Sequence, residues 1–418
     1  MGCAGTSRFV VCLFGCFYYY YCGAGGEEIK RTCLRYRSGS LFLMKVAVIA
    51  PSTVPSNTAN SIQVMKVCQS MMELGHEVRL WIPGRKSVPW ENLAEFYGIS
   101  SHFPIEWVPA FRHLRRYDMG LTAVLKAWRW KAEVIYTWMP QAAVYGSILG
   151  LPVVLEVHML PGGTMGKLLF SIFLRTRSRK RILIITQALK NLLEKALSLS
   201  LSSDSVQIAP MGFDPKQYEN LPQTQDARRQ LGIVAEGIIA GYTGHLYPGR
   251  GMEILYQLAL AYPNVRFLWV GGRPEDVRLW KSKIEQAGLN NILLTGFVPN
   301  SKLPVYQAAV DILLMPYERV VGVSSRGNTA DICSPMKMFE YLAAGKAILA
   351  SDLPVFHEVL NSSNAVFCSP SDINAWIETF GKLVTDVDWR ERLSQQAKED
   401  SVKYSWRIRT EKALRDLI

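Results

Sequence analysis

The segment SPMKMFEYLAAGKAILASDLP, residues 334–354, reads as a helix, a glycine stop and a short buried strand. Ser334 suits the N-cap, and Pro335 suits the first helical position, where its missing N–H costs no hydrogen bond. Gly345 is placed to end the helix, and the apolar run 347–351 is typical of a buried parallel strand. A helix that starts above a sheet in this way points unpaired N–H groups outwards, so the segment predicts an anion-binding site.

Two charged residues of this predicted helix suit a nucleotide. Lys337 follows the helix N-terminus, and Glu340 lies one turn later, where a carboxylate can accept hydrogen bonds from two hydroxyl groups such as those of a ribose. The alternative is a surface ion pair between these two residues, which are three positions apart and would contribute only ~0.2–0.5 kcal/mol.

The same segment resembles the donor-binding segment of glycosyltransferase family 4, a family of retaining enzymes with the GT-B fold. The matching residues are Ser-Pro-x-Lys-x-Phe-Glu-Tyr, Ala-Ala-Gly-Lys and Ser-Asp-Leu-Pro. The family pattern is Glu, seven residues, Glu; Glu340 matches the second position, but Ile332 stands at the first, whose side chain contacts the donor sugar in the family. The resemblance implies that the following residues bind the donor: Ser334, Pro335, Met336, Lys337 and Glu340.

The resemblance runs from about Met44 to the end of the chain. Gly244-His245-Leu246 and Arg250-Gly251 stand where the family has Gly-Arg-Leu and Lys-Gly. This implies that Gly244, His245 and Arg250 contact the donor diphosphate, with His245 charged only in part near neutral pH. The structural alternative is that Arg250 is a solvated loop residue. Val298 ends a segment that resembles the one whose main chain frames the nucleotide base.

The first half opens with a strand at 44–50, a helix at 61–75 and a strand at 76–83, the start of a doubly wound domain. The loop after the first strand faces the ligand crevice in such a domain. It lacks G-x-G-x-x-G, which argues against a dinucleotide oxidoreductase. Its polar residues Asn57 and Ser61 are candidates for sugar or acceptor contacts, although Ser61 could instead cap the helix.

Two further features lie at strand ends. His158 ends the apolar strand 152–158, on the crevice side of the sheet, and its Glu-Val-His context resembles the family segment whose His contacts the transferred sugar or the acceptor. The loop 318–333 is long, and such loops are usually functional. We expect Asn328 or Asp331 in this loop to do part of the work of the missing Glu, the alternative being that the loop is a disordered flap.

Composition limits the classes of function. The chain has 418 residues, 49% of them hydrophobic, which allows two domains, and its net charge is +12. A basic surface suits nucleic acid, anionic lipid or phosphorylated small molecules, but no nucleic-acid motif is present. Segment 166–181 joins an apolar stretch to basic residues, which predicts peripheral contact with an anionic membrane, or else a solvated helix end. Cys68, Cys333 and Cys368 lack metal or redox spacing, which suits a reducing, cytoplasmic location.

Four parts are expected along the chain. Residues 1–43 form an atypical extension, either a non-native or disordered start or a membrane anchor. Residues 44–205 form a Rossmann-like acceptor domain and residues 206–395 a Rossmann-like donor domain, the two facing a cleft. Residues 396–418 are expected to cross back and brace the first domain, as the terminal helices of the family do.

The sequence thus predicts a retaining glycosyltransferase that moves a sugar from a nucleotide diphosphate sugar to a glycan or lipid-linked acceptor, as in cell-surface polysaccharide or glycolipid synthesis. His158, Arg250 and Lys337 are the predicted catalytic residues, with the cations stabilising the leaving diphosphate. Neither a metal nor another cofactor is then expected. Because Ile332 and His245 depart from the family pattern, a non-catalytic sugar-nucleotide-binding subunit stays open, as does a sugar-nucleotide epimerase of the same fold.

Overall fold

A computed structural model of the protein describes residues 12–13, 16–17, 43–233, 236–320 and 329–417. The chain divides into two compact units, Met1–Leu41 and Phe42–Ile418. The first contains one antiparallel pair of short strands, β1 (Cys12–Leu13) and β2 (Cys16–Phe17). The second contains two parallel sheets with helices, and everything below concerns this unit.

The first sheet has seven parallel strands in the order β5-β4-β3-β6-β7-β8-β9. The strands are β3 (Lys45–Ile49), β4 (Glu77–Pro83), β5 (Ile105–Val108), β6 (Val134–Thr137), β7 (Val153–Val157), β8 (Lys180–Ile184) and β9 (Val206–Ile208). The helices between them are α1 (Ala59–Glu73), α2 (Trp90–Tyr97), α3 (Tyr117–Arg129), α4 (Pro140–Ile148), α5 (Gly163–Arg175) and α6 (Gln187–Leu197). The central strands β3, β6 and β7 are buried along almost their whole length because helices cover both faces of the sheet.

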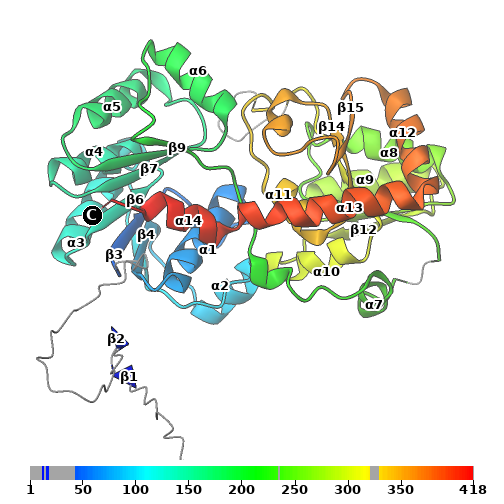
Figure 1. Ribbon diagram of the computed structural model, residues 1–418, viewed down its shortest axis with the longest axis horizontal. Coiled ribbons are helices and arrows are strands. Elements are labelled where there is room, and N and C mark those ends of the chain that lie inside the picture. Colours follow the sequence, from blue (N-terminus) through cyan, green and yellow to red (C-terminus); the bar gives the residue numbers. More distant parts are fainter. Residues whose placement is uncertain (1–11, 14–15, 18–42, 234–235, 321–328, 418) are drawn as a thin grey trace, which may run out of the picture. The chain divides into compact units, whose positions relative to one another are not determined.

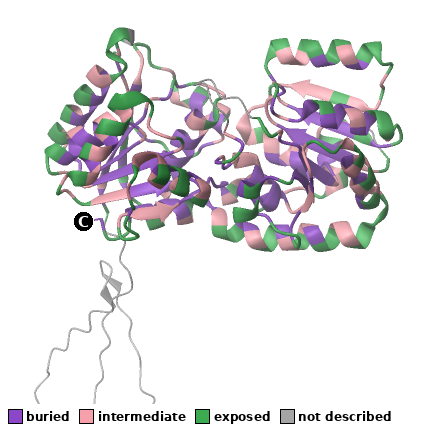
Figure 2. Cartoon of the chain, turned by 90° about the horizontal axis from the view of Figure 1, so that it is seen from above, coloured by how far each residue is buried: buried purple, intermediate pink, exposed green. Residues whose placement is uncertain are grey.

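The second sheet has six parallel strands in the order β12-β11-β10-β13-β14-β15. The strands are β10 (Ile239–Thr243), β11 (Arg266–Val270), β12 (Ile292–Gly296), β13 (Ile312–Met315), β14 (Ala347–Ser351) and β15 (Val366–Cys368). The helices are α7 (Thr224–Gln230), α8 (Met252–Ala261), α9 (Pro274–Gln286), α10 (Leu303–Ala308), α11 (Met336–Ala344), α12 (Ile373–Thr385), α13 (Val387–Ser401) and α14 (Trp406–Leu414). The buried residues of each domain gather on the strands of its sheet (Figure 2).

The prediction of two doubly wound domains is confirmed (Figure 1). Two expected boundaries need correction. β9 pairs with β8, so the first domain extends to Ile208 instead of ending at residue 205. α13 is one unbroken helix that packs against α11 and β14 of the second domain, so the boundary expected after residue 395 falls inside it. Of the last two helices, α14 is the one that packs along α1 of the first domain.

The basic segment 166–181 is not a single helix. α5 ends at Arg175, and β8 begins at Lys180. The ammonium of Lys180 donates hydrogen bonds to three carbonyls at the end of α5, those of Phe173, Leu174 and Thr176, at 2.9, 2.8 and 2.6 Å. Lys180 therefore caps the helix C-terminus and is not free to meet a membrane. Within the ranges given above, no helix is long and apolar enough to cross a membrane.

Two connections between the domains run side by side. The N–H of Phe213 donates to the carbonyl of Tyr404 at 3.1 Å, and the N–H of Trp406 donates to the carbonyl of Phe213 at 3.0 Å. A Cβ at Gly212 would lie 2.6 Å from the Tyr404 oxygen, so the close approach requires glycine. The outgoing connection and the returning one are thus joined through their backbones.

Candidate functional site

The helix α11 starts one residue later than predicted. Its N-cap is Pro335, in an extended conformation, and no side chain caps the helix. The hydroxyl of Ser334, expected as the cap, accepts instead a hydrogen bond at 3.0 Å from the N–H of Met211 in the connection between the domains. Ser334 therefore ties the start of α11 to that connection, while Gly345 ends the helix in the predicted left-handed conformation.

Two cations flank the ring of Tyr317 beside this helix. The Nζ atom of Lys337 lies 5.4 Å from the Tyr317 ring centroid and 3.8 Å from that of Tyr242. The guanidinium carbon of Arg250 lies 5.0 Å from the Tyr317 centroid and 4.9 Å from that of Tyr247, whose hydroxyl it also hydrogen-bonds at 2.6 Å. Arg250 is therefore held between aromatic rings, and the interpretation as a solvated loop residue is wrong.

Both cations keep donor atoms without partners. The Nζ of Lys337 and the Nε of Arg250 are buried, and neither has a hydrogen-bond acceptor in the described part of the chain. Burial, together with the charge of Arg250, lowers the pKa of Lys337 well below its ordinary value, while Glu340 opposes this. Enclosing two like charges with unused donors is costly unless an anion joins them. The pair is thus suited to a ligand that carries more than one negative charge.

Glycine is required where the backbone approaches this pair. A Cβ at Gly244, whose φ is +140°, would lie 2.7 Å from the Nζ of Lys337. A Cβ at Gly251, the N-cap of α8, would lie 1.5 Å from the carbonyl oxygen of Pro316. Gly244 and Gly251 therefore allow the backbone, and with it the Arg250 side chain, to lie against the end of β13.

His245 and Asn57, predicted separately, lie in contact. The backbone carbonyl of Asn57 accepts a hydrogen bond from the His245 ring, which also stacks on Tyr247 with centroids 5.2 Å apart. Burial, together with the charges of Arg250 and Lys337, lowers the pKa of His245 to about 4. The expected partial charge is thus corrected, because His245 is neutral at neutral pH. The contact joins the loop after β3 to the loop after β10.

Glu340 lies on the second turn of α11 and is not part of a surface ion pair. Burial raises the pKa of its carboxyl group, which Lys66 and Lys337 counteract, and the amide of Gln307 donates to it at 3.5 Å. The ammonium of Lys66 itself donates to the carboxylate of Asp214 at 3.2 Å. A half-enclosed carboxylate with spare acceptor capacity fits the predicted role on a ribose diol, which stays a prediction.

His158 follows β7 and is oriented by a buried carboxylate. Its Nε2 atom lies 2.9 Å from Oε2 of Glu156, which also accepts from the amide of Gln63 at 2.7 Å and from Arg409 at 2.6 and 3.0 Å. Burial alone would raise the pKa of Glu156, but Arg409 and His158 hold it well below its usual range. Glu156 is therefore ionised and fixes the imidazole of His158. Sequence reasoning missed Glu156 and Arg409, although a lone carboxylate within the apolar run PVVLEVH was a signal.

Ser61 does not cap α1 and does not face the cleft. It lies inside the helix and is fully buried, and its hydroxyl hydrogen-bonds the carbonyl of Thr53 at 3.0 Å and the hydroxyl of Tyr97 at 2.5 Å. Helix α1 starts two residues before Ser61, with Thr58 at the N-cap, so the hydroxyl is free to hold the loop after β3 in place. Its predicted sugar contact is replaced by this supporting role.

The remaining predicted site residues are not in contact with the two cations, as far as the structure describes them. Val298 follows β12 and is half-buried, and Asp331 is exposed. Ile332 is buried, and its carbonyl accepts a hydrogen bond at 3.0 Å from the hydroxyl of Thr186. Asn328 lies outside the described residues. Across the residues that the structure describes, no hydrogen bond, ion pair or ring contact joins His158, Val298 or Asp331 to Arg250 or Lys337.

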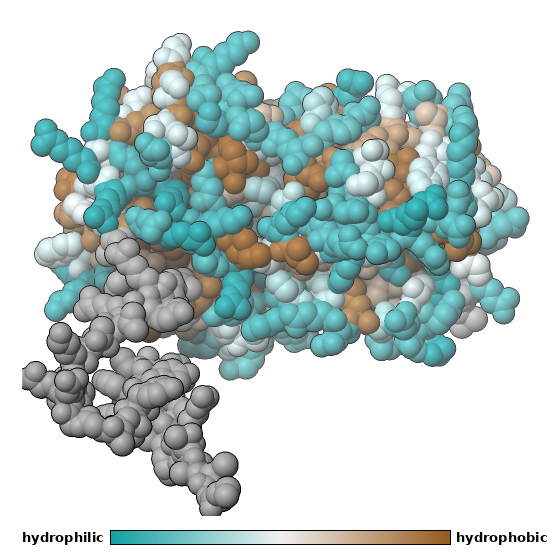
Figure 3. Space-filling model, viewed as in Figure 1, coloured by the Kyte–Doolittle hydropathy of each residue, from teal (hydrophilic) through white to brown (hydrophobic). Residues whose placement is uncertain are grey.

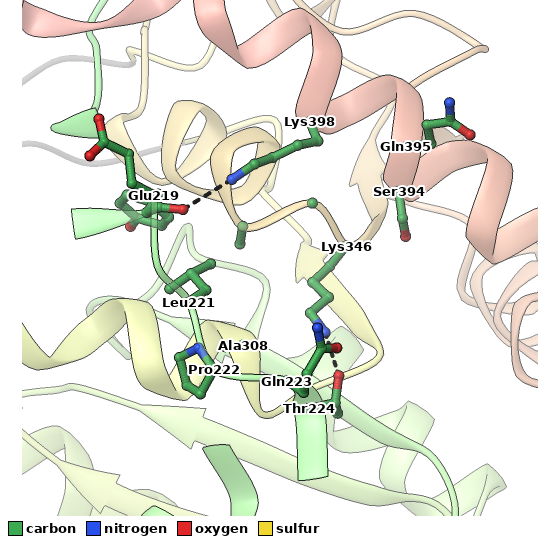
Figure 4. Close-up of a pocket in the computed structure, with 13 residues that line it drawn as sticks. Glu219, Leu221, Pro222, Gln223, Thr224, Ala308, Lys346, Ser394, Gln395 and Lys398 are labelled. Atoms are coloured by element: carbon green, nitrogen blue, oxygen red, sulfur yellow. Dashed lines mark hydrogen bonds between the residues drawn. The ribbon is translucent and has the colours of Figure 1, made fainter. Parts of the chain in front are cut away.

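A cavity of about 400 Å³ lies at the opposite, C-terminal end of α11 (Figure 4). Its two lysines are already bound: Lys398 donates to the carbonyls of Ala343 and Tyr218 at 2.6 and 3.2 Å, and Lys346 donates to the hydroxyl of Thr224 at 2.8 Å. One of these bonds satisfies the Ala343 carbonyl in the last turn of α11, and the cavity lies at the other end of the helix from the anion site. Over the described ranges, no cluster of three His, Cys, Asp or Glu side chains could hold a metal ion.

Comparison with known proteins agrees with this geometry. Residues 223–400 match the family model of the glycosyl transferases group 1. The phosphatidyl-myo-inositol mannosyltransferase of Mycolicibacterium smegmatis is 24% identical over 382 residues, which cover 87% of this chain and 91% of that protein. TuaH of Bacillus subtilis is 35% identical over 119 residues, and the match spans only 28% of the length of either protein. The crystal structure of Anabaena HepE in complex with UDP superposes with a TM-score of 0.66 at 18% identity, covering 88% of this chain and 98% of that one.

The fold is therefore that of GT-B glycosyltransferases, as predicted. The second domain matches the family model of the glycosyl transferases group 1 over residues 223–400, and the prediction that the chain is a glycosyltransferase is confirmed at that level. Membership of family 4 stays a prediction. The match includes Arg250, Lys337 and Glu340, the residues that surround the candidate anion site.

Proposed function

We propose that this glycosyltransferase takes a sugar from a nucleoside diphosphate sugar and transfers it, with retention of the anomeric configuration, to a glycan or lipid-linked acceptor. The observation that carries the proposal is the pair of buried cations, Lys337 and Arg250, whose donor atoms Nζ and Nε have no acceptor among the residues that the structure describes. A diphosphate supplies two adjacent anionic groups and matches this pair. The solved complexes of HepE with UDP and with UDP-glucose support a nucleotide sugar as donor.

The proposed chemistry follows from the position of the cations. As the glycosidic bond breaks, negative charge grows on the leaving diphosphate, and the Lys337 ammonium, the Arg250 guanidinium and the uncapped start of α11 stabilise it. We propose that these groups do the work of a divalent cation, so that turnover in the presence of EDTA equals turnover with added magnesium. Glu340 would hold the ribose, and His158, fixed by Glu156, would contact the transferred sugar.

We further propose that the first domain docks on an anionic membrane surface. On α3 the exposed Leu121, Leu125 and Trp128 form one helical stripe, and on α5 the exposed Met165, Leu168 and Ile172 form another. α4 packs against both helices, so the two stripes lie on helices that share α4 as a neighbour. Figure 3 shows apolar residues between hydrophilic ones on the visible face of this domain.

The basic side chains on the same helices complement acidic lipid. They are Arg129 on α3 and Lys167 and Arg175 on α5, whereas Lys126 of α3 pairs with Glu106. Each basic residue near an anionic surface contributes about 1 kcal/mol. A cytoplasmic enzyme at the membrane face would then reach a lipid-linked acceptor. Trp128→Glu should reduce sedimentation with phosphatidylglycerol vesicles several-fold, and equal sedimentation of both proteins would exclude this surface.

Donor binding is tested most directly by thermal shift with UDP, GDP and ADP at matched concentrations, because a ligand that binds the folded state raises the melting temperature by mass action. At least one nucleoside diphosphate should raise it clearly, whereas the nucleoside without phosphates should not. The absence of any shift with all three would reject the proposal. Release of nucleoside diphosphate from its sugar, dependent on added acceptor, separates a transferase from a binding subunit and from an epimerase.

A further inference from the structure

The first domain has a pocket of about 500 Å³ that the donor site does not use. Thr53 from the loop after β3, Gly84 and Arg85 from the loop after β4, and Phe111, Arg115 and Arg116 from the loop before α3 are among its lining residues. Three neighbouring parallel strands, β3, β4 and β5, thus end at this pocket. Ligands of open parallel sheets bind at these carboxyl ends.

The pocket is strongly positive. Arg85, Arg115 and Arg116 line it, and no ion pair to a carboxylate involves any of the three in the described part of the chain. The nearest acidic residue along the chain is Asp118, in the first turn of α3. Its carboxylate accepts a hydrogen bond at 2.8 Å from the N–H of Phe111. Thr53 adds a hydroxyl. Among the described residues no carboxylate pairs with these donors, and such a set suits a planar or tetrahedral oxyanion.

The backbone holds the arginines in an unusual conformation. Arg115 and Arg116 have φ values of 48° and 69°, in the left-handed region that residues with a side chain seldom adopt. Such strain persists where surrounding contacts enforce it, and it is concentrated at functional sites. Here one contact is the hydrogen bond from Arg116 Nη1 to the carbonyl of Pro51, at 2.6 Å.

The same loop reaches the donor site. Arg116 holds the Pro51 end of the loop after β3, and His245 holds its Asn57 end through the Asn57 carbonyl. A ligand in the pocket therefore sits beside a segment that also touches the phosphate-binding side of the cleft. Phe111, 49% exposed, adds an apolar wall for the carbon skeleton of that ligand.

We infer that this pocket binds an anionic group of the acceptor, a phosphate ester, through Arg85 and Arg115, so that the acceptor class is a phosphorylated polyol or sugar. The inference rests on the proposed function, since it concerns the second substrate of the same reaction. Arg116 positions the loop and is not assigned to the ligand.

The experiment is a titration with sn-glycerol 3-phosphate in the presence of saturating UDP, which occupies Lys337 and Arg250 beforehand. Arg85→Gln/Arg115→Gln should weaken binding roughly tenfold or more, because two charge-assisted hydrogen bonds are removed. Arg392→Gln, an exposed arginine on α13, is the matched control and should leave it unchanged. Equal affinity in all three proteins, or no binding to the unaltered protein, would overturn the inference.

The same design separates this inference from the proposed function. UDP should raise the melting temperature of the double variant as much as that of the unaltered protein. If UDP fails to bind either, the proposed donor site is wrong; if UDP binds both and glycerol phosphate binds neither, only the acceptor inference fails. Monomeric dihexanoyl-phosphatidylglycerol replaces glycerol phosphate in a second arm: tighter binding of this lipid assigns the pocket to a headgroup, and tighter binding of glycerol phosphate assigns it to a soluble ester.

Discussion

The carboxylate of Glu156 in β7 receives two hydrogen bonds from the guanidinium of Arg409 in α14, at 2.6 and 3.0 Å, across 253 residues of sequence. Both side chains are buried, and Arg409 also donates to the carbonyl of Pro210 at 2.8 Å. Glu156 in turn holds His158. The last helix of the chain therefore sets the position of a candidate catalytic side chain in the first domain.

The first prediction concerns this buried pair. Arg409→Leu leaves Glu156 buried without its partner and should lower the free energy of unfolding by about 3–5 kcal/mol. Arg407→Leu changes an exposed arginine on the same helix and should cost less than about 0.5 kcal/mol. Urea unfolding measures both. Adding Glu156→Gln to Arg409→Leu should recover part of the loss; similar small losses in all variants would contradict a coupled pair.

Lys337→Met separates stability from function. It replaces a buried ammonium, for which the described residues offer no acceptor, by an apolar chain of similar length, so the melting temperature should stay equal or rise. UDP affinity should fall roughly tenfold or more, and sugar transfer should be lost, since charge-assisted bonds contribute ~1.5–3 kcal/mol. Lys195→Met, an exposed change on α6, is the control. A variant that melts much lower and binds UDP normally would assign Lys337 to the fold alone.

Glu340→Gln tests the division between ribose and phosphate contacts. The variant keeps size and helix propensity but weakens hydrogen bonds to a diol, so UDP affinity should fall about tenfold. Binding of inorganic pyrophosphate, which has no ribose, should not change. Arg250→Ala should weaken both ligands and should reduce turnover further, because phosphate charge grows in the transition state. Calorimetric titration gives the affinities, and parallel losses of both ligands in Glu340→Gln would reject the ribose contact.

The low pKa of His245 predicts a dependence of stability on pH. The folded protein binds the proton with a pKa of about 4, whereas the unfolded chain binds it near the ordinary value of ~6.5. Between these values the unfolded state holds more protons, so this contribution to stability is complete above about pH 6.5 and falls by on the order of 3 kcal/mol as the pH drops towards 4. His245→Gln removes it. Curves of unfolding free energy against pH that run parallel for the two proteins would show that His245 is not responsible.

The parts of this structure that follow from local rules could be predicted from the sequence. Gly345 ends α11 because only a residue without a side chain takes the left-handed conformation easily, and the apolar run 347–351 forms β14 as expected. The short strands β5, β9 and β15 have three or four residues, too few to show a period. They form because each can hydrogen-bond to the exposed edge of a neighbouring strand.

The candidate site was predicted in pieces. Asn57 and His245 each stood out by position, but their hydrogen bond depends on how two domains meet, which no local pattern encodes. Ser334 looked like a cap because Ser before Pro usually is one, yet the Met211 amide takes its hydroxyl. For Glu156, the sequence indicated only that a carboxylate in a buried strand needs a partner of opposite charge; it did not indicate that this partner is Arg409.

The pairing between β7 and α14 also bears on how the protein is made. A ribosome makes Glu156 well before Arg409, which lies 253 residues later, and in the meantime the first domain contains a carboxylate without its guanidinium, a costly group to bury. Domains usually fold in the order in which they emerge. In this chain the domain that is made first can be completed only after the second has been made and α14 has returned to α1.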